Sequence, residues 1–204
     1  MDVQPSDTDV APAGWTMSAR FVKLVERSFA FLEDLGFRRT STEPGLVEYE
    51  SDRAFVNLSW DVRSGELNAL LGLVPRTGQA WDKYALADIL GVAGLPASDC
   101  RPAQVAEERR LEPFIARLAG NIRTHAQPAL LGDRAYFRRL EAFRAATANA
   151  QMREMKLRQV RAEVEQAWQE RQFERVVSLY TSVEDALSES ELSKLEYAKR
   201  QQSR

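Results

Sequence analysis

The chain has very few of the side chains that carry most enzyme chemistry. Its 204 residues include one cysteine, Cys100, and one histidine, His125. A single cysteine cannot form an internal disulfide, and one cysteine with one histidine does not give the ligand spacing of a zinc site. The two could still meet in the fold as a nucleophile and its base. Their settings, a proline-rich break and the end of a predicted helix, favour structural roles instead.

Several common sequence signals are also missing. The chain has no GxGxxG, no GxxxxGK and no GxSxG motif, which are the marks of dinucleotide sites, phosphate loops and nucleophile elbows. No apolar run reaches the length of about 20 residues that spans a bilayer, and the first twenty residues lack the basic start and apolar centre of a signal peptide. We therefore expect a cytoplasmic protein without a cofactor, without a bound metal and without a membrane partner.

The bulk composition is that of an ordinary globular protein. Hydrophobic residues make up 44% and charged residues 28%, with a formal net charge of -2, so no global attraction to nucleic acid is expected. The length suits one domain with an appendage. We expect a disordered leader at 1–16, an α+β domain at 17–97 and a helical region at 98–204.

The α+β domain is predicted from two kinds of periodicity. In "SARFVKLVERSFAFLEDLGF", apolar residues recur at helical steps, and Gly36 stands where a helix often ends in a left-handed residue. Three alternating segments then follow, "LVEYE", "RAFVNLSWD" and "ELNALLGLV". Period-two patterning with short polar joins indicates an antiparallel meander. The predicted fold is an N-terminal helix packed on a small three-stranded antiparallel meander, followed by a helical C-terminal half.

The segment "SDRAFVNLSWDVRSGEL", residues 51–67, concentrates charge within this meander. Its polar ends fall where the chain must reverse, and Asp, Ser and Gly suit a reversing backbone. Trp60 falls on the apolar face, so we expect it in the core. The alternative is a binding role for Asp61, Arg63 and Glu66, because loops also carry functional sites.

The rest of the chain is predicted to be helical. "WDKYALADILGVAG" is typical of a short helix with Asp82 as its N-cap and Gly94 as its stop. The segment 103–126 predicts a longer helix that kinks or restarts at Pro113. From Asp133 onward almost the whole chain has helical patterning.

Residues 133–161 form a basic segment, with eight Lys or Arg against three Asp or Glu. Such a segment could face phosphate or an acidic partner. It could equally be a solvated helix face, because residues 162–204 offer nine acidic and six basic residues for compensation. Little aromatic interleaving is present, which argues against stacking on single-stranded nucleic acid.

The C-terminal segment "QAWQERQFERVVSLYTSVEDALSESELSKLEYAKR" resembles a tetratricopeptide helix pair, over about residues 160–204. Phe173 matches the aromatic that opens the second helix of that family, and Tyr180 matches its later aromatic. "SESE" is typical of a capping box before a further helix. Two departures are Arg171, where the family often has glycine, and a missing proline between repeats. The resemblance covers about one and a half repeats, fewer than a peptide-binding solenoid needs.

Most of the chain also resembles a group of uncharacterised bacterial proteins, some of which occur beside secreted-toxin genes. The residues behind this resemblance are "LEDLGF", "VEYESDRAFVNLSWDVRSGELNALLG", "YALADILGVAG", "LLGDRAYFRRLE" and "LEYAKR". The resemblance implies an immunity or accessory role. It implies no catalytic residues.

The hypothesis that these patterns favour is a non-catalytic protein-binding module, such as an immunity-type inhibitor or accessory protein, rather than an enzyme. Its partner would be another protein, and its candidate binding surface consists of Arg63, Glu66, Trp81, Lys83 and Tyr84. One alternative is a hydrolase, a nuclease or phosphoesterase, that uses carboxylates such as Asp52, Asp61, Glu66 and Asp82 with a divalent metal. The other is a regulator that contacts nucleic acid through the basic segment 133–161.

Overall fold

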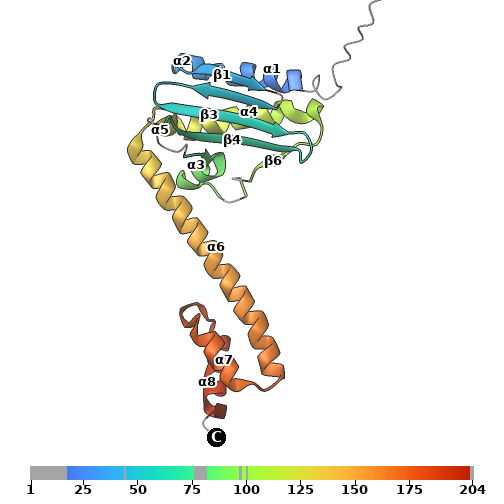
Figure 1. Ribbon diagram of the computed structural model, residues 1–204, viewed down its shortest axis with the longest axis vertical. Helices are drawn as coiled ribbons and strands as arrows, with labels where there is room; N and C mark the ends of the chain where they lie inside the picture. The colour runs from blue at the N-terminus through green and yellow to red at the C-terminus, as the bar shows by residue number, and fades with distance from the viewer. Residues whose placement is uncertain (1–17, 44, 76–81, 97, 100, 203–204) are drawn as a thin grey trace, which may run out of the picture. The chain divides into compact units, whose positions relative to one another are not determined.

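The computed structural model describes residues 18–43, 45–75, 82–96, 98–99 and 101–202, which divide into two units, Met1–Phe143 and Arg144–Arg204 (Figure 1). An antiparallel sheet with helices is followed by a helical C-terminal half, which confirms the α+β prediction. The predicted leader, Trp81 and Cys100 lie outside the described residues. None of the helices in the described ranges is both long and apolar enough to cross a bilayer.

The sheet of the first unit has more strands than predicted. The predicted meander corresponds to β2 (Leu46–Glu50), β3 (Ala54–Asp61) and β4 (Glu66–Leu73). β1 (Arg38–Glu43) extends it on one edge, and two short strands, β5 (Tyr84–Ala85) and β6 (Ala103–Gln104), both pair with β4. All pairs are antiparallel. The prediction of three strands missed β1 because "RRTSTE" does not alternate apolar and polar residues. It missed β5 and β6 because two residues are too few to show alternation.

The strand register separates a covered face from an uncovered one. Leu58 pairs with Val47 on one side and with Ala69 on the other, and all three side chains are buried. The next residue of β3, Asn57, points to the opposite face and is only half-buried. The alternation predicted from the sequence is therefore confirmed, because residues that pair across an antiparallel sheet lie on the same face.

Helices cover one face of this sheet. They are α1 (Ser18–Ser28), α2 (Phe31–Asp34), α3 (Leu86–Val92), α4 (Leu111–His125) and α5 (Gln127–Leu130). Figure 1 shows α4 crossing behind the strands, and α1 contacts both α4 and β2. The apolar residues of these helices share one core with the covered face of the sheet.

The first predicted helix is divided into α1 and α2. Phe29 is fully buried at the division, and Gly36 ends α2 with the predicted left-handed backbone, at a φ of 82°. The N–H of Gly36 donates to the carbonyl of Glu33, and the N–H of Phe37 donates to the carbonyl of Leu32. This pair of bonds satisfies the last carbonyls of the helix.

Two predictions about helix starts need correction. Asp82 is not the N-cap of α3, because the helix begins after Ala85, whose N–H donates to the Asp88 carboxylate over 3.1 Å. The longer predicted helix begins at Leu111, so Pro113 lies in the first turn of α4. Proline is tolerated there, since the first helical N–H groups have no intrahelical acceptor.

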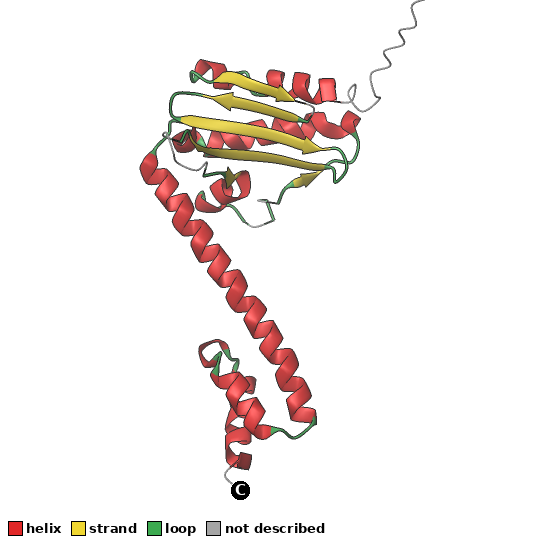
Figure 2. Cartoon of the chain, viewed as in Figure 1, coloured by secondary structure: helices red, strands yellow, loops and turns green. Residues whose placement is uncertain are grey.

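The described part of the second unit is helical, with short connecting loops (Figure 2). The later part of α6 (Arg134–Gln169) packs with α7 (Phe173–Thr181) and α8 (Glu189–Gln202). Their shared core contains Val160, Val164, Ala167, Val176, Tyr180, Val183, Leu195 and Ala198. The helical C-terminal region is thus confirmed, with a core of its own.

Candidate protein-binding surface

The charged ends of the segment 51–67 stabilise turns. The Oγ of Ser51 accepts from the backbone N–H of Ala54 at 3.1 Å, and Asp61 Oδ1 accepts from the N–H of Arg63 at 2.8 Å. The bonds from the N–H of Arg63 and from Ser64 lower the pKa of Asp61. Trp60 is 2% exposed, as predicted for a core residue. These polar side chains are therefore explained by the local backbone.

The candidate surface from the sequence does not form one patch. Glu66 pairs with Gln104 at the start of β4, whereas Tyr84 pairs with Leu71 five residues later. At about 3.3 Å per residue, this separates Arg63 and Glu66 from Lys83 and Tyr84 by roughly 17 Å along the strand.

Tyr84 is buried and is not a surface residue. Its side chain is 7% exposed, and its ring packs against Phe137 with centroids 5.7 Å apart. The prediction that Tyr84 presents its side chain to a partner is wrong, because a residue 53 positions later in the chain covers it. Arg63 and Lys83 are exposed, and Glu66 is half-buried.

The carboxylates of the hydrolase alternative are also dispersed. Asp61 lies opposite Glu66 in the β3–β4 hairpin, whereas Asp52 and Asp82 lie near the far end of β4. Among the described residues, no three His, Cys, Asp or Glu side chains come together in a way that could hold a metal ion. His125 is half-buried at the last residue of α4.

The uncovered face of the sheet carries a clear excess of acid. We call it the open face. Its carboxylates come from every long strand, and they are Glu43, Glu48, Glu50, Asp61 and Glu66. The cations beside them are Arg38, which lies opposite Glu50 in the strand register, Arg63, which lies beside Asp61, and Lys83. Asn57, Ser59 and Asn68 lie between the acids. The open face therefore presents a negative potential with adaptable hydrogen-bonding groups.

A depression of about 410 Å³ lies on the open face. Glu48, Glu50 and Asn57 line it together with Lys83, Thr40, Tyr49 and Phe55. Glu48 and Glu50 are two positions apart on β2, so both carboxylates point to the same side. Such a pair beside an amide suits a guanidinium or ammonium group from a partner.

Phe55 and Gly72 make a close contact beside the depression. Phe55 is 2% exposed although its position in the register places it on the open face. It pairs with Gly72, where an added Cβ would lie 2.5 Å from its ring and 2.2 Å from the carbonyl oxygen of Asp82. The carbonyl of Asp82 therefore lies close above the end of β4, and the next residue, Lys83, lines the depression.

Glu48 and Glu50 were not singled out in the sequence. In "LVEYE" they alternate with Val47 and Tyr49 and so indicate only the solvent side of a strand. The sequence does not show the strand register. Only the pairing of the strands brings the acids of β1, β3 and β4 onto the same face as Glu48 and Glu50. Of the predicted surface residues that the structure describes, Lys83 is the one that lines the depression.

The sheet edge at β1 is poorly suited to adding a strand from a partner. Five of its six residues are exposed, and its pairing with β2 shifts between Arg39 and Ser41. Charged side chains and bulges are the features that keep edge strands from pairing with other chains. The open face, rather than the edge, is therefore the candidate binding surface of the first unit.

Four of the eight basic residues of the segment 133–161 have polar partners within the second unit. Arg153 forms an ion pair with Asp185, and Lys156 Nζ donates to the carbonyl of Ser182 at 2.9 Å. Arg158 pairs with Glu154 at 3.2 Å, one turn earlier on the same helix. For residues 153–161 this arrangement fits a solvated helix face that pairs with acidic neighbours.

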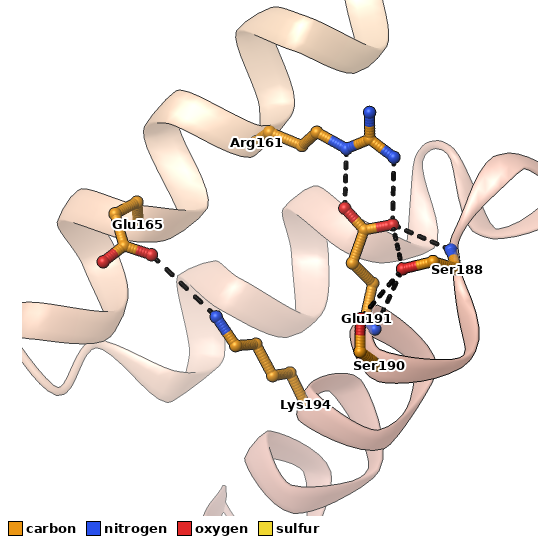
Figure 3. A network of polar contacts seen from close by, with 6 residues as sticks. All are labelled: Arg161, Glu165, Ser188, Ser190, Glu191 and Lys194. Carbon is orange, nitrogen blue, oxygen red and sulfur yellow. Dashed lines mark hydrogen bonds and ion pairs between the residues drawn. The ribbon is translucent and has the colours of Figure 1, made fainter.

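A network of polar contacts joins α6 to the start of α8 (Figure 3). Arg161 donates to both carboxylate oxygens of Glu191, at 2.6 and 3.1 Å, and Glu191 accepts from the N–H of Ser188 at 2.7 Å. These donors lower the pKa of Glu191 to about 2. The N–H of Glu191 donates to Ser188 Oγ at 3.4 Å, which completes the predicted capping box.

No family model matches the chain, and neither a curated protein nor a solved structure matches it. The candidate surface therefore rests on the geometry described above.

Proposed function

We propose that the chain is a non-catalytic protein-binding module whose open face binds a basic surface of another protein. The observation that carries this proposal is the excess of five carboxylates over three cations on and beside the open face. Complementary charge steers association and rejects partners of the wrong sign. The depression beside Glu48 and Glu50 gives such a partner a place to insert one cationic side chain as an anchor.

The specific form that we propose is an immunity-type inhibitor or accessory protein. An acidic face can cover a basic site of a toxic partner without any bond-making chemistry of its own. The resemblance to proteins encoded beside secreted toxins supports this form, and it makes a neighbour-encoded protein the first partner to test.

The experiment is affinity capture followed by a binding titration. The chain would be co-expressed with each neighbour-encoded protein, and any captured partner would be titrated against wild type and against Glu48→Lys/Glu50→Lys. We expect at least a tenfold loss of affinity for this variant, because reversed charges on the open face repel a basic partner.

The matched control is Asp34→Lys/Glu174→Lys, which makes the same charge change at two exposed residues outside the open face. It should bind like wild type, apart from a small effect of net charge. Equal affinity of both double variants would contradict the proposal. So would the absence of any neighbour-encoded binder.

A further inference from the structure

A cavity of about 50 Å³ lies between the covered face of the sheet and two helices of the first unit. We call it the α3–α4 cavity. Its walls are apolar and come from β4, α3 and α4, and they include Leu67, Ala69, Leu86, Leu90 and Leu118. Leu67 and Ala69 are buried on the covered face, so the cavity lies on the opposite side of the sheet from the open face.

One side of α4 lines this cavity. Phe114, Leu118 and Asn121 follow one another at steps of four and three residues, and all three are half-buried. Arg117 lies next to this row and is exposed. At 100° per residue, Ile115 and the other core residues of α4 lie on a neighbouring side of the helix. The helix therefore gives the cavity an apolar wall with polar groups at its outer edge.

Two exposed arginines line the mouth of the α3–α4 cavity. They are Arg117 and Arg101, which comes from the segment before β6. The guanidinium carbon of Arg117 lies 5.4 Å from the centre of the Phe114 ring. This contact holds the guanidinium beside the apolar wall and does not require its N–H donors.

The mouth of the cavity has more positive than negative charge. Neither Arg101 nor Arg117 forms an ion pair with a residue in the described ranges. One carboxylate, that of Asp99, also lines the cavity, and it accepts from Ser98 Oγ at 3.1 Å. Two guanidinium groups therefore face one carboxylate, which favours an anionic ligand.

We propose that the α3–α4 cavity binds a small carboxylate that carries a short aliphatic group. Arg101 and Arg117 donate to the carboxylate, since a planar guanidinium matches the geometry of its two oxygens. The side-chain amide of Asn121 offers a further donor. The aliphatic group of the ligand lies against Leu90 and Leu118.

The volume of the cavity limits the size of the aliphatic group. An apolar cavity of about 150 Å³ accommodates benzene. With about a third of that volume, the α3–α4 cavity accommodates a branched group of about three or four carbons. Exposed ion pairs contribute little on their own in water. Binding therefore requires both the charge and the aliphatic group of the ligand.

A titration with three small molecules tests this requirement, with isovalerate as the probe. Isobutylamine has the same branched group with the opposite charge, and acetate has the carboxylate without the branched group. Each would be added to the full chain labelled with ¹⁵N and followed by NMR. We expect isovalerate to shift the amide signals of Leu90 and Leu118, with an affinity at least tenfold higher than that of either control molecule.

Substitutions test the residues of the cavity. Arg101→Gln/Arg117→Gln should weaken isovalerate binding at least tenfold, because the carboxylate loses both cations. The matched control is Arg123→Gln, which removes another exposed arginine of α4 whose guanidinium carbon lies 5.5 Å from the centre of a phenylalanine ring. It should bind isovalerate like wild type. Ala103→Leu adds apolar volume at the cavity wall and should abolish binding.

Three results would each overturn the proposal. They are the absence of saturable shifts at the cavity, equal affinity for isobutylamine, and unchanged affinity in the double arginine variant. If Ala103→Leu does not fold, the arginine variants still decide, because both side chains are exposed. None of these results bears on the open face, so the proposed function is tested separately.

Discussion

The indole N–H of Trp60 donates to the backbone carbonyl of Val105, 45 residues later in the chain, over 3.0 Å. Both residues are 2% exposed. The bond joins the end of β3 to the segment that leads into α4. The N–H of Val105 in turn donates to the carbonyl of Gly65, at 2.6 Å. These two hydrogen bonds therefore connect the β3–β4 hairpin to the segment that precedes α4.

Trp60→Phe should destabilise the first unit by about 2–3 kcal/mol. The change leaves the buried carbonyl of Val105 without its indole donor, and it removes ring volume that packs against Phe21. Urea unfolding would give the loss of stability, and hydrogen exchange would show faster opening in peptides from β3 and β4. A loss below about 0.5 kcal/mol would mean that the bond is unimportant.

Gly72→Ala and Gly120→Ala should have opposite effects. The new methyl group at Gly72 would overlap the Phe55 ring and the carbonyl of Asp82, which predicts a loss of about 2–3 kcal/mol. At Gly120, inside α4, no atom lies within 4 Å of the added Cβ. Alanine should therefore stabilise that helix by about 0.5–1 kcal/mol. Thermal unfolding of both variants checks the pair, and equal effects would contradict the close crossing above Gly72.

Arg171→Gly should stabilise the second unit by about 0.5–1 kcal/mol. Arg171 has a φ of 57°, which an L-residue adopts at a cost, and its N–H and that of Gln172 close the end of α6. Glycine adopts this conformation without that cost. Arg171→Ala is the control, since it removes the same side chain but keeps a Cβ. Hydrogen exchange in α6 and α7 should slow for the glycine variant alone.

The second unit should lose stability in acid through Glu191. The folded pKa of Glu191 is about 2, below its ordinary value of 4.5, so the stabilisation is complete above pH 4.5 and is lost as pH falls towards 2. Glu191→Gln should remove about 1–2 kcal/mol at pH 7, because the bidentate bond from Arg161 loses its charge. Its stability should then depend less on pH over that range than that of wild type.

The control for this prediction is Glu189→Gln, which removes a carboxylate from the same first turn of α8. It should change stability by no more than about 0.5 kcal/mol. If both variants show the same acid profile as wild type, the bond between Arg161 and Glu191 does not stabilise the unit.

The sequence predicted the strands that bury one face, because burial makes apolar and polar residues alternate along them. β2, β3 and β4 bury one face against helices, so their alternation is visible in the residues themselves. β1 was missed because most of its residues are exposed, and β5 and β6 because two residues have no period. The capping box at Ser188 and Glu191 was predicted, because a cap depends on residues close together in sequence.

The candidate surface was harder to predict because it depends on register. Lys83 lies near Glu48 and Glu50, and the residue before it, Asp82, lies against Gly72. Tyr84 is buried by Phe137, which no local pattern could indicate. The hydrogen bonds of Ser51 and Asp61 are made to residues two or three positions away. The prediction that these side chains stabilise turns was therefore possible from the sequence, and it is confirmed.

Carboxyl footprinting of the complex can show whether the open face is where a basic protein binds. Exposed Asp and Glu side chains would be labelled with a carbodiimide and an amine, with and without the captured partner, and located by mass spectrometry. We predict that labelling of Glu48 and Glu50 falls several-fold on binding while that of Glu174 is unchanged. Undiminished labelling of Glu48 and Glu50 in a saturated complex would contradict the claim.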